Sequence, residues 1–152
     1  MEPVGEFVWD VRVAATETQA ARAFVRKHQF DVGVPLSFDL EEERVTALET
    51  ALGAIGAEVV VGLRRVARKH RLVLDDVEAT VQARLRNALV YLGVIGEAGD
   101  PGMRQVRIRV YVTTAAPADA VERVWKEVLA TSPLICTLRD AVDLELTYKI
   151  IL

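Results

Sequence analysis

Residues 51–63 read Ala-Leu-Gly-Ala-Ile-Gly-Ala-Glu-Val-Val-Val-Gly-Leu, and this stretch decides the fold. Glu58 is its only side chain that is neither apolar nor absent. We predict a helix from about Arg44 to His70, because the stretch ends in a basic cluster that complements a helix macrodipole. A helix that is apolar all round must be buried all round. We therefore expect a sheet against one side of this helix and a second element against the other.

Composition and charge exclude several classes of function. The chain has 152 residues, which fits a single domain over residues 1–152. Its apolar stretch is shorter than the roughly 20 residues of a membrane span, and Glu58 interrupts it. The formal net charge of −3 disfavours nucleic acid or an anionic membrane as a partner. The first ten residues lack the features of a signal peptide, so we expect a cytoplasmic protein.

Residues that commonly ligate metals are sparse in the sequence. Cys136 is the only cysteine, which excludes an internal disulfide framework and a cysteine-based metal cluster. His28 and His70 have no carboxylate or cysteine companions at the spacing of metal ligands. We therefore predict neither a metal nor a cofactor.

The apolar periodicity predicts an α+β fold. The strand with the clearest alternation spans residues 103–113, where Val106, Ile108, Val110 and Val112 share one face. Ser132 and Pro133 suit the N-cap and first position of a short helix. The predicted order is βββ–α–ββ–α–α–β, with strands at 4–15, 20–27, 28–34, 77–85, 103–113 and 141–151, and helices at 44–70, 117–130 and from 133.

Three segments, in the right order, resemble the OsmC/Ohr family of osmotically inducible and organic-hydroperoxide-resistance proteins. Residues 46–55, TALETALGAI, are similar to the start of that family's central helix, E-x-L-L-x-A-L-G-A-C. Residues 91–94 and 101–112 are similar to its strand, loop and G-F-x-x-I-x-V strand. Residues 132–138, SPLICTL, are similar to its C-P-V-x-x-T-L helix start. The resemblance covers about Phe24 to the C-terminus.

The resemblance implies an OsmC-like fold, an intertwined homodimer and a role in the stress response. Two central helices would pack back to back between two sheets, which would account for a helix that is apolar all round. In active relatives, a thiolate on the central helix attacks a peroxide and a second thiol resolves the sulfenic acid as a disulfide. A nearby Glu and Arg tune the first thiol.

This sequence departs from the family at both cysteine positions. The first is Ile55, which has no nucleophile, and the second is Ser132, whose unactivated hydroxyl cannot replace a thiolate. The early Glu of the motif falls near Val45 or Thr46, so that carboxylate is missing too. The two-cysteine mechanism is therefore closed to this chain, which we interpret as a degenerate peroxidase.

Glu58 and Cys136 are the remaining candidates for chemistry. A carboxylate within an apolar helix must be paired or protonated. We consider Arg22 and Arg26 as its partners, and both a ligand anchor and a purely structural ion pair stay open. Cys136 lies four residues past Ser132 in a helix's first turn, a position that lowers a thiol's pKa. It is either a relocated reactive thiol or a small buried hydrophobe.

Two functions follow from these residues. The first is an OsmC-like homodimer without two-cysteine chemistry, binding a small apolar or amphipathic molecule in a dimer-interface pocket near Ile55, Glu58, Ser132 and an N-terminal arginine. The alternative is a one-cysteine thiol peroxidase that reduces organic hydroperoxides through Cys136 and needs an external thiol. The sequence leaves open whether the protein is an enzyme.

Overall fold

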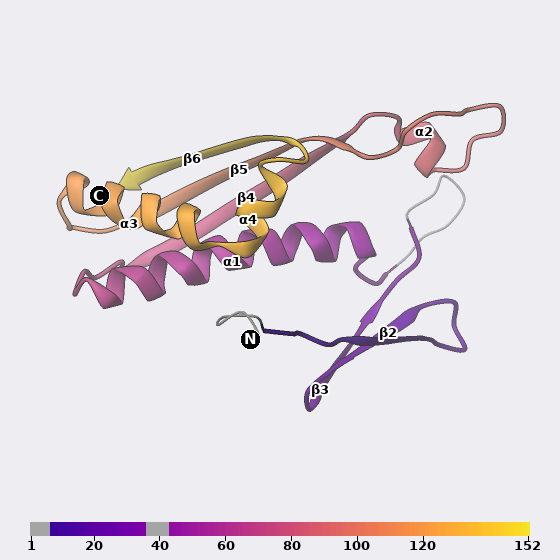
Figure 1. Ribbon diagram of the computed structural model, residues 1–152, viewed down its shortest axis with the longest axis horizontal. Coiled ribbons are helices and arrows are strands. Elements are labelled where there is room, and N and C mark those ends of the chain that lie inside the picture. The colour runs from indigo at the N-terminus through magenta and orange to yellow at the C-terminus, as the bar shows by residue number, and fades with distance from the viewer. Residues whose placement is uncertain (1–6, 36–42) are drawn as a thin grey trace, which may run out of the picture. The chain divides into compact units, whose positions relative to one another are not determined.

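A computed structural model describes residues 7–35 and 43–152 and divides the chain into two compact units, residues 1–50 and 51–152. The predicted element order is confirmed, with one additional short helix, α2 (Figure 1). The elements are β1 Arg12–Ala15, β2 Ala21–Val25, β3 His28–Val32, α1 Ala47–Lys69, β4 Asp76–Leu85, α2 Ala88–Tyr91, β5 Met103–Thr113, α3 Ala118–Thr131, α4 Pro133–Leu138 and β6 Asp143–Ile151.

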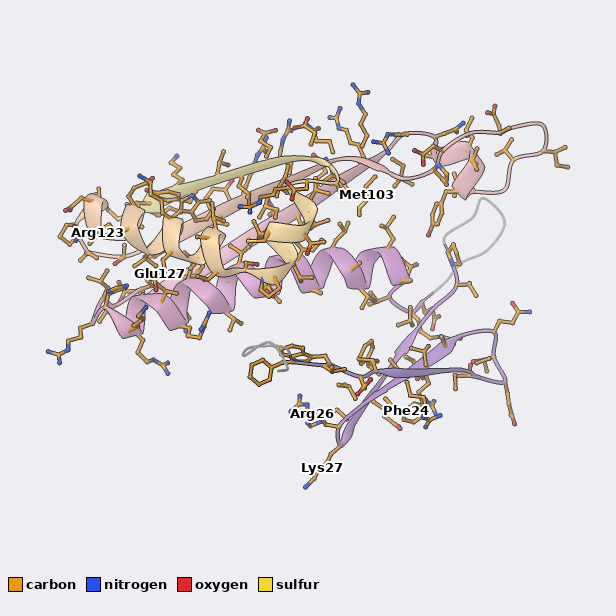
Figure 2. The ribbon with its side chains drawn as sticks, viewed as in Figure 1. Phe24, Arg26, Lys27, Met103, Arg123 and Glu127 are labelled. Carbon is orange, nitrogen blue, oxygen red and sulfur yellow. The ribbon has the colours of Figure 1, made fainter. Side chains whose placement is uncertain are left out.

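The first unit contains an antiparallel sheet in the order β1-β2-β3. The prediction of a strand from residue 4 was wrong over residues 7–11, and residues 1–6 lie outside the described part. The reason is that β2 is only five residues long, so the pairing of Arg12 with Phe24 is the outermost in the ladder. Arg26, which we expected in the second strand, lies in the β2–β3 turn with a φ of 53° (Figure 2).

A capping box begins α1. The Thr46 backbone N–H donates to Glu49 Oε1 at 3.1 Å, and the Glu49 N–H donates to Thr46 Oγ1 at 3.3 Å. This reciprocal pair satisfies two backbone N–H groups at the helix start. It begins the helix at Ala47, three residues later than the predicted start near Arg44. The signal was present in the sequence as Thr-x-x-Glu, and our interpretation of the acidic run before the helix overlooked it.

The second unit contains a sheet in the order β4-β5-β6. β4 and β5 are antiparallel, whereas β5 and β6 are parallel because the two helices α3 and α4 carry the chain across between them. The predicted alternation of β5 is confirmed, since Val106, Ile108, Val110 and Val112 are all at most 1% exposed. These residues form the sheet's contribution to the core.

The helices α1 and α3 cover one face of this sheet (Figure 1). The core joins α1 residues such as Val59 and Leu63 to β5 and to Val124, Trp125 and Val128 of α3. The opposite side of α1 is exposed and carries Ala54, Ala57 and Val61, among others. The predicted sheet side of the helix is therefore confirmed, and within residues 51–152 the other side of α1 has no covering element. None of the helices in that part of the chain is both long and apolar enough to cross a bilayer.

Two of the three glycines in α1 allow neighbouring elements to pack closely against the helix. A Cβ on Gly56 would lie 2.8 Å from Val81 Cγ2 of β4, and one on Gly62 would lie 3.0 Å from Val128 Cγ1 of α3. Gly53, by contrast, has no heavy atom within 4 Å of its Cβ position. At Gly56 and Gly62, the loss of helix propensity is thus offset by the close packing of a neighbouring side chain.

The segment after β4 differs from the prediction. The predicted elements include no helix between residues 85 and 103, but residues 88–91 form the single-turn helix α2. Asn87 caps it by accepting hydrogen bonds from the N–H groups of Leu89 and Val90 at 3.1 and 3.3 Å. The glycines and the proline that follow are typical of a loop, but Asn87 is a favourable N-cap residue and starts a short helix before them.

Candidate functional site

Glu58 joins the middle of α1 to the start of α4. One carboxylate oxygen, Oε2, accepts a short hydrogen bond from the Ser132 hydroxyl. The same oxygen accepts the backbone N–H of Leu134 at 3.0 Å. Two donors thus converge on a single half-buried carboxylate. Glu58 is paired, as the sequence required, but with a hydroxyl and a backbone amide from α4.

Ser132 is positioned by the helix that it caps. Its backbone is extended, and its Oγ accepts the N–H of Ile135 at 3.2 Å. Pro133 occupies the first turn, where its missing N–H costs nothing. Because its oxygen accepts from Ile135, the hydroxyl hydrogen remains available for Glu58. Ser132 is only 5% exposed, so this hydrogen bond is shielded from water.

Ile55 lies one helical turn before Glu58 on the same side of α1. It is 5% exposed and belongs to the core cluster that also contains Ile135 of α4. The side chain is therefore part of the packing between the helices and the sheet. It offers an apolar surface next to the carboxylate and no group that could react.

Cys136 is half-buried on α4. Its Sγ lies 3.6 Å from the carbonyl oxygen of Leu129 and 3.7 Å from that of Ala130, both in the last turn of α3. These are the contacts of a thiol that donates weakly to carbonyl oxygens. No positively charged group is among the contacts of Sγ in the described part of the chain.

The two arginines proposed as partners of Glu58 belong to the first unit. Arg22 forms a two-point ion pair with Asp31 across β2 and β3, at 2.7 Å and 3.1 Å. This hydrogen bonding lowers the pKa of Asp31 and raises that of Arg22. Arg26 lies in the adjoining turn (Figure 2). That either arginine approaches Glu58 stays a prediction.

The basic end of α1 is bound to α3 by a carboxylate that sequence reasoning missed. Glu127, labelled on α3 in Figure 2, accepts a hydrogen bond from Lys69 Nζ at 2.5 Å, and its other oxygen lies 2.6 Å from His70 Nε2. These hydrogen bonds lower the pKa of Glu127, with Lys69 the largest cause. Glu127 carried no signal in the sequence, because a helical Glu next to apolar positions is typical of any amphipathic helix.

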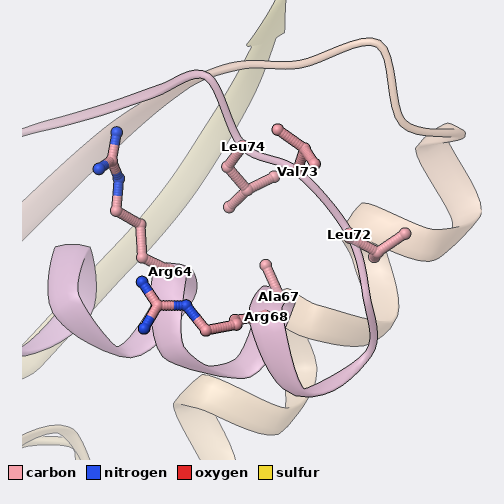
Figure 3. A pocket seen from close by; sticks show the side chains of 6 residues that line it. All are labelled: Arg64, Ala67, Arg68, Leu72, Val73 and Leu74. Atoms are coloured by element: carbon pink, nitrogen blue, oxygen red, sulfur yellow. The ribbon is translucent and has the colours of Figure 1, made fainter.

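The other cations of this helix end border a small pocket. Arg64 and Arg68 rise above an apolar floor that includes Leu72 and Leu74, around a cavity of about 250 Å³ (Figure 3). Arg64 also donates to the carbonyl oxygen of Asp75 at 3.1 Å. Within residues 7–35 and 43–152, no three His, Cys, Asp or Glu side chains gather as metal ligands do.

Comparison with known proteins places this arrangement in a family. The sequence signature of the OsmC family, described as OsmC-like protein, matches residues 40–147. The chain belongs to the OsmC-like family. No curated protein matches the chain. The match spans the whole second unit except its last strand residues, and includes Ile55, Glu58 and Ser132.

Solved structures share the OsmC-like fold over almost their entire length. An OsmC like protein from Mycoplasma pneumoniae has a TM-score of 0.79 at 11% identity, covering 97% of this chain and 99% of that one. An organic hydroperoxide resistance protein OsmC from Legionella pneumophila has a TM-score of 0.68 at 14% identity, covering 94% and 97%. The organic hydroperoxide resistance protein OhrB of Bacillus subtilis has a TM-score of 0.61 at 14% identity, covering 94% and 98%. The predicted OsmC-like α+β fold is confirmed.

In this OsmC-like protein, the two positions that the resemblance assigns to cysteines hold a buried isoleucine and a serine bonded to a carboxylate. The structure brings Glu58 and Ser132 together, and Ile55 lies one turn away. Cys136 lies on α4, the short helix that Ser132 caps, but its sulfur faces the end of α3.

Proposed function

We propose that this OsmC-like protein has lost two-cysteine peroxidase chemistry and acts as a homodimer that binds a small apolar or amphipathic molecule beside Glu58. The observation that carries the proposal is the hydrogen bond from Ser132 to Glu58. It occupies the place where the family resemblance expects the second thiol. A carboxylate that accepts from a hydroxyl and an amide is an anchor for polar groups, and it cannot be oxidised or form a disulfide.

The residues available explain why peroxide chemistry is lost. Reduction of a hydroperoxide by a thiol protein requires a thiolate that attacks one oxygen and becomes a sulfenic acid. Ile55 has no lone pair to offer, and the Ser132 oxygen already accepts one hydrogen bond while its hydrogen is donated to Glu58. Even if Glu58 removed the Ser132 proton, the resulting alkoxide could not reduce a hydroperoxide, because a serine oxygen has no counterpart of the oxidation of a thiol to a sulfenic acid. The pair is suited to holding a ligand.

Exposed apolar surface supports the homodimer. Val61 on the outer side of α1 is 63% exposed, and Ala54 and Ala57 continue that exposed side toward the helix start. In the first unit, Phe7 and Trp9 are 75% and 83% exposed. Exposed apolar surface of this kind, on each unit taken by itself, is typical of an interface. A second copy would cover the side of α1 that the protein's own sheet leaves open.

The dimer is tested by light scattering coupled to size-exclusion chromatography. Wild type is expected to remain dimeric on dilution to low micromolar concentration, and Ala57→Glu to shift toward the monomer because it places a charge in the apolar interface. Thr80→Glu, on the exposed face of β4, is the matched control and should leave the dimer intact. A monomeric wild type at every concentration would refute the proposed assembly.

The alternative is a one-cysteine peroxidase that uses Cys136. It is favoured by the partial exposure of the thiol and by its position four residues from Ser132. The hydroperoxide would oxidise the thiolate to a sulfenic acid and leave as an alcohol, and an external thiol would then reduce the sulfenic acid. The contacts of Sγ weigh against this function, because within the described residues they are two carbonyl oxygens, whereas reactive thiols usually lie beside a positively charged group.

A peroxide-consumption assay separates the two functions. Cumene hydroperoxide and tert-butyl hydroperoxide are supplied with a thiol reductant to wild type and to Cys136→Ser. We expect no enzymatic turnover from either protein. Turnover by wild type that disappears in Cys136→Ser would establish the alternative instead.

Ligand binding is tested separately by native mass spectrometry of the freshly purified protein. The expected result is an adduct above the mass of the 16.8 kDa chain, or of its dimer, which is depleted in Glu58→Gln. Glu97→Gln, in an exposed loop, provides the control. An adduct of equal abundance in all three proteins would show that Glu58 is not its anchor.

A further inference from the structure

A second cavity borders α4, and neither Ser132 nor Glu58 lines it. It is an open groove of about 560 Å³ between α3, α4 and β6. That volume falls within the roughly 300–1,000 Å³ typical of small-molecule sites. All of its lining residues belong to the second unit, so the groove is complete without any partner.

Most of the side chains that line the groove are apolar. Leu129 and Ala130 come from α3, Ile135 comes from α4, and β6 with the residue before it contributes the rest of the floor. The residues of that floor are Val142, Leu144 and Leu146. A hydrocarbon chain is the simplest group that would be buried against this aliphatic lining.

Two cations border the groove. Arg139 follows the last turn of α4, is exposed, and forms no ion pair within the described residues. Lys126 on α3 has only a loose contact of 3.8 Å with Glu122, on a side chain that is 74% exposed. The other oxygen of Glu122 accepts the Tyr148 hydroxyl. Both cations are therefore available to a ligand.

One carboxylate, Asp143, also lines the groove, but a hydrogen bond turns part of its negative charge away from a ligand. Asp143 Oδ2 accepts a hydrogen bond from Gln105 Nε2 of β5 at 3.2 Å. That contact holds one of its oxygens toward the neighbouring strand. Two cations against one partly engaged carboxylate leave the border of the groove positive.

From this combination we propose that the groove binds a single-chain amphiphilic carboxylate. The hydrocarbon chain would lie on Leu129, Ala130 and Leu144, above the buried Ile135, and the carboxylate between Lys126 and Arg139. Charge complementarity selects an anion over a neutral or cationic amphiphile of the same length. This site is separate from the proposed pocket beside Glu58, and it requires neither the dimer nor Cys136.

The test uses octanoate as the probe and methyl-resolved NMR to locate it. Titration is expected to shift the methyl signals of Leu129, Ile135 and Leu144 saturably, and to leave those of Val61 and Leu63 on α1 in place. Octanol and octyltrimethylammonium, which carry the same chain, are expected to bind at least about tenfold more weakly than octanoate. Saturable shifts confined to α1 would overturn the proposal, and so would equal binding of the three amphiphiles.

Substitutions then test each half of the site. Arg139→Gln and Lys126→Gln should each weaken octanoate binding about threefold to fivefold, and the double variant about tenfold or more, as expected for exposed charge pairs. Arg123→Gln removes a cation from the same helix but does not line the groove, so it should bind like wild type. Ala130→Trp should block the apolar part and abolish binding.

Two further outcomes would contradict the proposal. Undiminished octanoate binding by the double variant would show that the cations do not hold the carboxylate. Shifts of the same methyl signals on simple dilution of the protein would show that a second copy occupies the groove. The result is independent of the Glu58 experiments, because Glu58→Gln should leave octanoate binding unchanged.

Discussion

Replacing Glu58 should reveal how much the junction between α1 and α4 contributes to stability. Glu58→Ala removes the acceptor of both the Ser132 hydroxyl and the Leu134 N–H. The first bond is partly buried, since Ser132 is 5% exposed and Glu58 is half-buried, whereas Leu134 is 37% exposed and its N–H can bond to water instead. Most of the cost therefore comes from the hydroxyl.

The magnitude follows from these two contacts. A buried hydrogen bond to a charged group contributes about 1.5–3 kcal/mol to the free energy of unfolding. The exposed amide adds about 0.5–1 kcal/mol, as for a helix cap. We thus expect Glu58→Ala to lower the free energy of unfolding by about 2–4 kcal/mol, a large share of the roughly 5–15 kcal/mol of a typical domain. Glu58→Gln retains the oxygen without its charge and should lose about 1–2 kcal/mol.

The assay is urea unfolding followed by circular dichroism, at one fixed protein concentration because assembly affects the apparent stability. A double-mutant cycle with Ser132→Ala isolates the contact, and we expect a coupling energy of about 1–2 kcal/mol. Glu97→Ala, in an exposed loop, should change the free energy of unfolding by less than about 0.5 kcal/mol. Additive effects of Glu58→Ala and Ser132→Ala would refute the reasoning.

Three other predictions concern packing and ionisation. Gly53→Ala should stabilise the protein by up to about 1 kcal/mol through helix propensity. Gly56→Ala should destabilise it by about 1–3 kcal/mol, because the new methyl group would lie 2.8 Å from Val81 Cγ2 of β4. Urea unfolding of both variants measures the two changes. One tyrosine should titrate late by ultraviolet absorbance, since the hydrogen bond to Glu122 raises the pKa of Tyr148 to about 12, and Glu122→Gln should return that pKa toward 10. Because the pKa of Glu127 is lowered in the folded state, its stabilising contribution is complete above the unfolded pKa and is lost as the pH falls through the folded pKa. The urea midpoint of Glu127→Gln should therefore decline less than that of wild type between neutral and acidic pH.

Local sequence patterns were sufficient to predict an element and its buried face wherever that face packs against the protein's own core. The alternation in residues 103–113 predicted the buried face of β5 because a strand places every second side chain on the same side. The helix predicted at residues 117–130 likewise corresponds to α3, whose buried face carries Val121, Val124, Trp125 and Val128 at helical spacing. Ser132 and Pro133 predicted the start of α4, because capping depends on only a few neighbouring residues.

Prediction failed where an element depends on a distant partner or on its length. Residues 7–11 alternate like a strand, but β2 is too short to provide a ladder for them. The one-turn helix α2 depends on the cap at Asn87, whereas the surrounding glycines and prolines suggested an irregular loop. Glu127 could not be singled out, because its partners Lys69 and His70 are far away in sequence.

The sequence by itself determined the α+β order, the long apolar helix, the family resemblance and the absence of cysteine at both family positions. Each of these depends on local periodicity or on residue identity. It also required that Glu58 be paired, since an unpaired carboxylate in an apolar helix is too costly. Only the tertiary structure decided that the partners are Ser132 and the Leu134 N–H, because the packing of α3 against α1 sets where α4 begins. The groove between α3, α4 and β6 likewise exists only once three separate segments are brought together.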